Sequence, residues 1–172
     1  MRKFRVALGL GLVCLIAGAV LAQKADRTYD HKAPWRSYRT FMWLRQPDME
    51  DNAMNDQVAS VVAGQLQAHG WQLVTDNADV GVVANAATEG RHTNDSFYSN
   101  FPDWRWQRWE DAEEVEVKAY PVGSLVVDLF DGRTKRLIFR GYAEDMFSKK
   151  PEKNLEKMNK AVAKLFDDFP PK

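Results

Sequence analysis

An Asp-Gly pair between two strand-like runs is the feature that most restricts how this chain can fold. The runs Gly123–Phe130 and Lys135–Ala143 are rich in β-branched and aromatic residues, and the tetrapeptide Asp131-Gly132-Arg133-Thr134 separates them. Asp-Gly between two such runs is typical of a tight reversal of the chain. The pattern therefore predicts an antiparallel hairpin.

Two further segments repeat apolar residues at the spacing of an amphipathic helix. In the segment Asn52–His69 the stripe is Met54, Val58, Val61, Val62 and Leu66. In the segment Pro151–Phe169 it is Leu155, Met158, Val162, Leu165, Phe166 and Phe169. We expect Asp51 or Asn52 to cap the first helix and Gly70 to follow its end in a left-handed conformation.

The remaining strand-like segments complete a mixed sheet. They are Arg36–Leu44, Trp71–Val74, Val80–Ala86 and Glu114–Tyr120. A strand–helix–strand passage forms a parallel crossover, whereas the later hairpin is antiparallel. Both helical stripes are buried if the helices lie on the same side of the sheet. We therefore predict an α/β fold, a two-layer sandwich in which a mixed β-sheet carries two helices packed on one face.

The N-terminus has the pattern of an export signal. Basic residues in Met1–Arg5 precede the apolar run Val6–Val20, and small residues at Val20 and Ala22 suit a signal peptidase. We expect residues 1–22 to be a signal peptide cleaved after Ala22, which leaves no transmembrane span. Residues 23–34 are polar and are predicted to form a flexible arm, followed by a single α/β domain over residues 35–172.

Composition excludes several classes of protein. The chain has 24 basic and 24 acidic residues, and this balance argues against a nucleic-acid binder. The single cysteine, Cys14, rules out an internal disulfide framework. Cys14 lies inside the apolar run and follows Val13 rather than a small residue, so we expect it to leave with the signal peptide and not to be lipidated.

Three pieces of the sequence resemble a known family. They are the strand Tyr38–Trp43, the hairpin Gly123–Asp131 with Thr134–Ala143, and the ending Lys164–Phe166 with Phe169–Lys172. In this order they resemble the bacterial envelope family of lipoprotein-like chains known as domain of unknown function 4136, over about residues 35–172. The resemblance implies a small α/β envelope domain, and it implies no catalytic residue.

The sequence has no signature of catalysis or of a cofactor. The histidines His31, His69 and His92 lack the spacing of metal ligands, so we predict no metal site. Ser96 near His92 and Asp95 is not a recognised nucleophile pattern, and no glycine-rich phosphate loop is present. Asp128 is expected to face solvent or to pair across the hairpin with Lys135, Arg136 or Arg140.

The segment Phe97–Trp109 (FYSNFPDWRWQRW) is unusually aromatic. Its candidate binding residues are Trp104, Arg105, Trp106, Arg108 and Trp109, because exposed tryptophan with arginine stacks on sugars, peptides or partner proteins. The alternative is that these rings cover the sheet face that the helices leave open. We favour the covering role and keep binding as the second interpretation.

Together these observations favour an exported bacterial envelope domain that binds a protein or glycan partner and is not an enzyme. A small hydrolase with an unrecognised carboxylate site is the alternative, and a purely structural envelope protein is a weaker one. The sequence does not identify the partner or the oligomeric state.

The export signal gives the first prediction. Intact-mass measurement of the protein from the envelope fraction should give a chain that begins at Gln23, because Val20 and Ala22 suit the peptidase. A mass that retains Met1, or that includes a diacylglycerol on Cys14, would contradict this prediction.

Overall fold

The computed structural model describes residues 24–90, 92–98, 119–144, 146 and 151–170. Ten elements follow one another along this part of the chain. They are β1 (Ala25–Tyr29), the 3-10 turn η1 (Trp35–Ser37), β2 (Thr40–Arg45), α1 (Asn52–Ala68), β3 (Gln72–Leu73), β4 (Val80–Ala86), α2 (Asn94–Tyr98), β5 (Leu125–Asp131), β6 (Leu137–Ala143) and α3 (Pro151–Leu165).

The strands form one mixed sheet in the order β1-β6-β5-β4-β2-β3. Strand β2 runs parallel to both β3 and β4, so α1 is the crossover helix of a strand–helix–strand unit. Strands β4, β5, β6 and β1 are antiparallel to their successive neighbours. The predicted crossover and the predicted hairpin are both confirmed.

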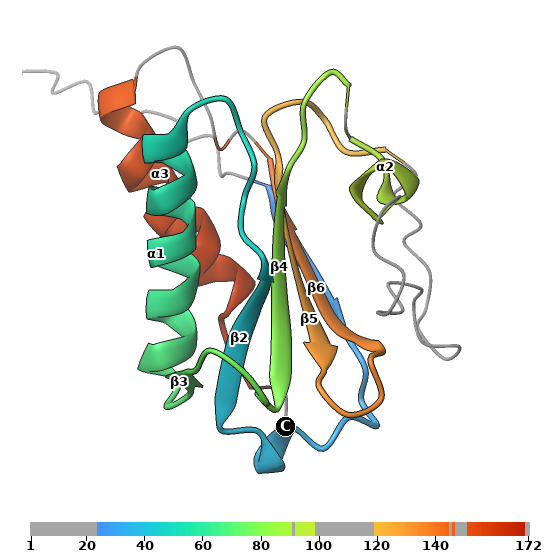
Figure 1. Ribbon diagram of the computed structural model, residues 1–172. Coiled ribbons are helices and arrows are strands. Elements are labelled where there is room, and N and C mark those ends of the chain that lie inside the picture. The colour runs from blue at the N-terminus through green and yellow to red at the C-terminus, as the bar shows by residue number, and fades with distance from the viewer. Residues whose placement is uncertain (1–23, 91, 99–118, 145, 147–150, 171–172) are drawn as a thin grey trace, which may run out of the picture.

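Helices α1 and α3 lie side by side on one face of the sheet (Figure 1). Val58, Val62 and Leu66 of α1 are fully buried, as are Met158, Val162 and Leu165 of α3. This confirms the predicted two-layer α/β sandwich. The stripe of α3 differs at Leu155, which is 44% exposed, while Ala161 of the same helix is buried. Leu155 stands one turn before Met158, toward the start of α3, and is not part of the core beneath that helix.

Helix α1 begins and ends at the capping residues that the sequence predicts. The carboxylate of Asp51 accepts a hydrogen bond from the Met54 amide at 3.1 Å, so Asp51 is the cap. Gly70 follows the helix with a φ of +87°, a conformation that suits glycine. The amides of His69 and Gly70 donate to carbonyls of the last turn.

The opposite face of the sheet carries a second, smaller core. It joins residues of the central strands to Phe97 and Tyr98 of α2 and to Tyr120. Figure 1 shows α2 on the side of the sheet away from α1 and α3. Every residue of β4, β5 and β6 is buried, which is possible only because both faces of these strands are covered.

Two parts of the prediction need correction, and a third lies mostly outside the described residues. Residues 25–29 are not part of an arm, because they form β1 and pair with β6 from Ala25 opposite Ala143 to Tyr29 opposite Phe139. The predicted strand Arg36–Leu44 is divided into η1 and β2. The predicted strand Glu114–Tyr120 lies outside the described residues except for Ala119, which bridges Thr93, and Tyr120.

No helix of the described ranges is both long and apolar enough to span a membrane. The predicted signal peptide, residues 1–22, lies outside the described residues, so its cleavage stays a prediction.

The burial of α1 gives the second prediction. Val62→Asp should lower the free energy of unfolding by more than about 3 kcal/mol, because it places an unpaired charge in the core between α1 and the sheet. Ser60→Asp on the exposed side of the same helix should change it by less than about 0.5 kcal/mol. Urea unfolding of both variants and the parent measures the difference, and equal stability of the two variants would disprove the packing of α1.

Candidate functional site

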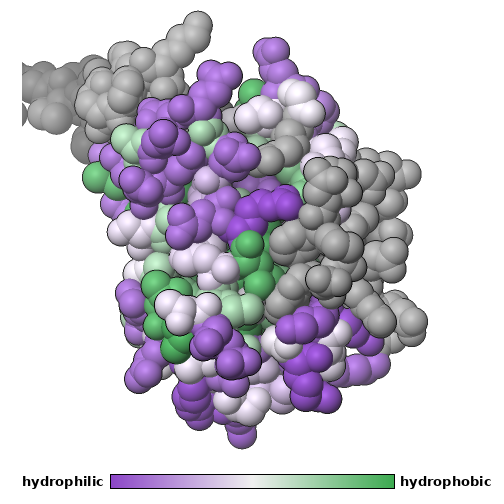
Figure 2. Space-filling view, viewed as in Figure 1, coloured by the Kyte–Doolittle hydropathy of each residue, from purple (hydrophilic) through white to green (hydrophobic). Residues whose placement is uncertain are grey.

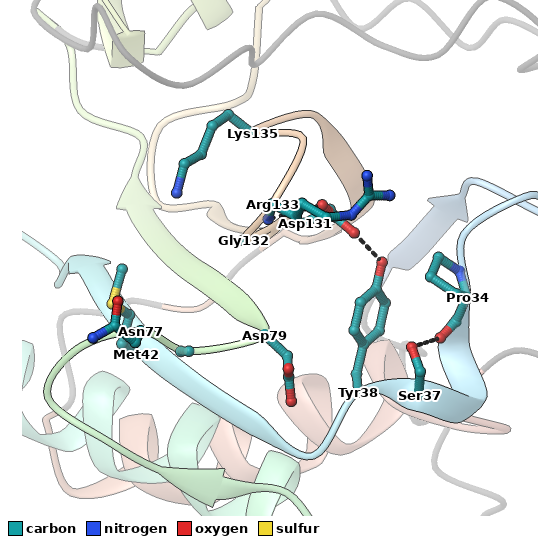
Figure 3. Close-up of a pocket in the computed structure, with 11 residues that line it drawn as sticks. Pro34, Ser37, Tyr38, Met42, Asn77, Asp79, Asp131, Gly132, Arg133 and Lys135 are labelled. Carbon is teal, nitrogen blue, oxygen red and sulfur yellow. Dashed lines mark hydrogen bonds between the residues drawn. The ribbon is translucent and has the colours of Figure 1, made fainter.

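A groove lies at the end of the sheet where β2 and β4 begin and β5 ends. The register places these ends together, because Val80 pairs with Phe41 on one side and with Asp131 on the other. The groove has a volume of about 420 Å³, within the usual range of ligand sites (Figure 3). Its walls come from three segments, and the lining residues are Pro34, Ser37, Tyr38, Met42, Asn77, Ala78, Asp79, Asp131, Gly132, Arg133 and Lys135.

Asp131 organises the hairpin tip on one side of the groove. Its Oδ1 accepts hydrogen bonds from the amides of Arg133 at 3.0 Å and Thr134 at 2.6 Å. Its Oδ2 accepts the hydroxyl of Tyr38 at 2.6 Å, which ties the hairpin to the segment before β2. Within the turn the positive φ of +61° is at Lys135. The aspartate of the Asp-Gly pair therefore fixes the loop through its side chain.

Gly132 is required for close approach of two chain segments. Its amide donates to the carbonyl of Asp79 at 2.7 Å. A Cβ at position 132 would lie 2.3 Å from the carbonyl oxygen of Ala78 and 2.8 Å from that of Asp79. Any other residue would push the hairpin away from the loop before β4 and widen the groove.

Asp79 holds the start of β2 against the start of β4. Its Oδ2 accepts the amides of Arg39 and Thr40, at 2.8 and 2.9 Å, and the hydroxyl of Thr40 at 3.0 Å. In return the hydroxyl of Thr40 accepts the Asp79 amide at 2.9 Å. The two residues thus satisfy each other's backbone amides, as the two residues of a helix capping box do.

The hydrogen bonds decide the charge of both carboxylates. Burial acts to raise the pKa of Asp79, but the donors of Arg39 and Thr40 outweigh it and hold the pKa below its ordinary value. The pKa of Asp131 is also lowered, since Tyr38 and the turn amides outweigh its burial. Burial and the neighbouring Asp131 raise the pKa of Tyr38, so its hydroxyl remains a donor. Both acids are therefore ionised and fixed at neutral pH.

The same three segments carry a group of cations. Arg133 and Lys135 line the groove together with the carboxylates of Asp79 and Asp131, and Arg36 and Arg39 belong to the segment before β2. The guanidinium of Arg39 donates to the carbonyl of Tyr38 at 2.6 Å. In Figure 3, Arg133 lies above Tyr38, and Lys135 reaches into the space on the other side of the hairpin tip. Figure 2 shows hydrophilic side chains over this lower end of the molecule.

A second polar cluster is buried on the sheet face that α2 covers. Arg140 binds Asp128 through two hydrogen bonds, Nε to Oδ1 at 2.7 Å and NH2 to Oδ2 at 2.6 Å. The hydroxyl of Tyr98 also donates to Asp128, and burial raises the pKa of Tyr98 well above its ordinary value. The expectation that Asp128 faces solvent is wrong, and its pairing with Arg140 is confirmed. The strand alternation located the pair, but it did not reveal that this face is covered.

The aromatic segment Phe97–Trp109 lies mostly beyond the described part of the chain. Phe97 and Tyr98 are buried against the second core, with Phe97 stacked on Tyr120 at 5.7 Å between ring centres. The candidate binding residues Trp104, Arg105, Trp106, Arg108 and Trp109 fall outside the described residues. Their two interpretations, covering or binding, both stay predictions.

The structure does not bring the other candidates together. The ring of His69 packs on Phe169 at 5.5 Å, while the Nδ1 of His92 is 3.1 Å from the Thr88 carbonyl. No group of three metal-ligating side chains occurs among the described residues. The hydroxyl of Ser96 donates a hydrogen bond to the Thr93 carbonyl at 2.7 Å and accepts one from the Thr93 amide. Both bonds stabilise the first turn of α2.

The sequence and the fold of the chain can be compared with known protein families and solved structures. A family model described as Domain of unknown function (DUF4136) matches residues 25–171. This chain belongs to the DUF4136 family. The match begins at β1, in agreement with the corrected start of the domain. No protein of curated function matches the sequence.

Several solved structures are similar to this DUF4136 chain. One is a DUF4136 family protein from Bacteroides thetaiotaomicron, with a TM-score of 0.59 and 12% identity, over 84% of this chain and 94% of that one. Another is a PDZ domain protein from Parabacteroides distasonis, with a TM-score of 0.51 and 11% identity, over 86% of this chain and 35% of that one. A PelC dodecamer from Paraburkholderia phytofirmans has a TM-score of 0.49 and 14% identity, over 84% and 94%.

Sequence reasoning did not find the groove of this DUF4136 domain. Tyr38 and Asp131 both occur in the motifs that carry the family resemblance, and the Asp-Gly pair marks the hairpin tip. Asp79 had no comparable signal, since a lone aspartate before a strand is common in turns. The contact between Asp79, Thr40 and Gly132 depends on the order of the strands.

The carboxylates of the groove give the third prediction. A carboxylate with a lowered pKa in the folded chain stabilises it above the ordinary pKa of 3.8, and this stabilisation is lost as the pH falls below that value. Asp79→Asn should therefore lose less stability than the parent between neutral pH and about pH 3. Asp76→Asn, at an exposed position nearby, should follow the parent. Unfolding titrations at several pH values measure this, and parallel curves for Asp79→Asn and the parent would contradict the role of Asp79.

Proposed function

We propose that this chain is an exported bacterial envelope domain that binds a protein or glycan partner through the groove and does not catalyse a reaction. The leader pattern of residues 1–22 supports export. The groove supports binding, because it is a concave site with converging polar groups at one end of a rigid sheet.

The observation that carries the proposal is the state of the two groove acids. A hydrolase that uses two carboxylates needs one of them protonated near neutral pH, with its pKa raised. Hydrogen bonds instead lower the pKa of both Asp79 and Asp131. Each acid is occupied by amides and hydroxyls of its own chain, so these acids serve as structural anchors of a binding surface.

A crosslinking experiment in intact cells tests this function and gives the fourth prediction. A photoreactive residue at exposed Asn77, on the rim of the groove, should form a covalent adduct with the partner. The same residue at exposed Ser60, on the outer side of α1, should not do so. The captured molecule should keep its mass after incubation with the purified protein, because the domain only binds it.

Two outcomes would overturn the proposal. Equal adducts at Asn77 and Ser60, or none at Asn77, would show that the groove is not the binding surface. Conversion of the captured molecule to products by the purified protein would show that the domain is an enzyme, and the hydrolase alternative would then be preferred.

A further inference from the structure

Two buried polar side chains, Asn85 and Ser124, are not hydrogen-bonded to any other group. Both residues are fully buried. Within the described part of the chain, the oxygen and the nitrogen of the Asn85 carboxamide and the hydroxyl of Ser124 have no hydrogen-bond partner. A buried polar group left in this state lowers the folding equilibrium constant by about fivefold or more. Such groups are rare in folded proteins, and each one needs an explanation.

The two side chains lie on the same face of the sheet and next to each other. Val83 of β4 belongs to the second core, so Asn85, two residues later, points to the same side. Val126 of β5 also belongs to that core, and Ser124, two residues before it, shares its face. Asn85 pairs with Val126, and the amide of Ala87 donates to the Ser124 carbonyl at 2.8 Å. Asn85 and Ser124 are therefore diagonal neighbours across the pair of strands.

The spacing of this pair fits one small bridging molecule. Diagonal neighbours in an antiparallel pair are about 7–8 Å apart, and their side chains cover part of that distance. Asn85 and Ser124 are not bonded to each other. Two hydrogen bonds in series through a single oxygen atom span about 5–6 Å, which is the distance left to bridge when two neighbouring polar groups do not meet directly.

The surroundings favour a neutral molecule that both donates and accepts hydrogen bonds. Val83 and Val126 beside the pair are apolar and fully buried. On the same face Asp128 and Arg140 bind each other at 2.6 Å, so neither of them is a free counter-ion for a charged ligand. A carboxamide has a donor and an acceptor, and a hydroxyl acts as either. The occupant therefore has to be able to do both.

We infer that Asn85 and Ser124 bind one ordered water molecule, which is part of the second core. A water molecule can accept from Nδ2 of Asn85, donate to Oδ1 of the same carboxamide and form its third bond with the Ser124 hydroxyl. Buried waters typically make about three hydrogen bonds to polar groups that have no other partner. The water links β4 to the residue before β5 on the side of the sheet where α2 lies (Figure 1). Its site shares no residue with the groove, so it does not depend on the proposed function.

A crystal structure of the processed protein, at a resolution that shows ordered waters, tests this site and is the fifth prediction. It should contain a single peak of electron density, the size of one oxygen atom, within about 2.7–3.2 Å of the Asn85 carboxamide and of the Ser124 hydroxyl. A direct hydrogen bond between the two side chains, the absence of density between them, or density for a larger molecule would each overturn the assignment of a water.

Urea unfolding of Ser124→Ala tests the same site in solution. If a water is bound, the substitution removes one of its partners, and the equilibrium constant for unfolding should rise by about fivefold. If nothing is bound, the same substitution removes an unsatisfied hydroxyl from the core, and the constant should fall. Ser60→Ala on the exposed side of α1 is the matched control and should change the constant by less than about twofold.

The double variant shows whether the two residues share one molecule. Asn85→Leu combined with Ser124→Ala removes every group that the water binds, so it should be less destabilised than the sum of the two single variants. Additive effects, or a fall in the unfolding constant for Ser124→Ala, would disprove the shared water. Neither result affects the capture of a partner at Asn77, so the proposed binding function is tested separately.

Discussion

The buried ion pair between Asp128 and Arg140 is the interaction on which the second face of the sheet depends. Asp128 is fully buried in the middle of β5, and its carboxylate accepts hydrogen bonds from the facing Arg140 guanidinium and from the Tyr98 hydroxyl. Removing one partner of such a pair costs about 3–5 kcal/mol, because the other charge stays buried and unpaired. A shift of β5 against β6 by one residue would separate the two charges. The pair therefore specifies the register of the hairpin and the place where α2 covers the sheet.

The groove also contains carboxylates that are held by hydrogen bonds, but their donors are different. At the groove the carboxylates accept hydrogen bonds from main-chain amides and from the hydroxyls of Tyr38 and Thr40, so the two acids anchor three segments of the chain. In the buried pair the cation is used within the fold, whereas at the groove the guanidinium of Arg133 faces outward. The difference explains why one polar cluster is structural and the other is a candidate site.

The sequence predicts those elements whose signal is local. The stripe of α1 and the Asp-Gly turn each lie within a few residues, and so does the cap at Asp51. Strand β1 was missed because it is short and polar and its partner β6 lies more than a hundred residues away, as the Lys24–Glu144 ion pair illustrates. Helix α2 has five residues, too few to show a period. The groove joins three separate segments, so its existence follows from strand order and not from any one motif.

The topology also sets the electrostatics at the end of the sheet where the groove lies. In open α/β sheets, ligands commonly bind at the carboxyl ends of parallel strands, where helix N-termini supply a positive dipole. Here the groove lies at the amino ends of β2 and β4, the end toward which α1 and α3 direct their C-termini (Figure 1). Helix C-termini carry a partial negative charge and repel anions. Arg133 and Lys135 at the hairpin tip therefore place positive charge at the same end of the sheet as the negative ends of the two helix dipoles.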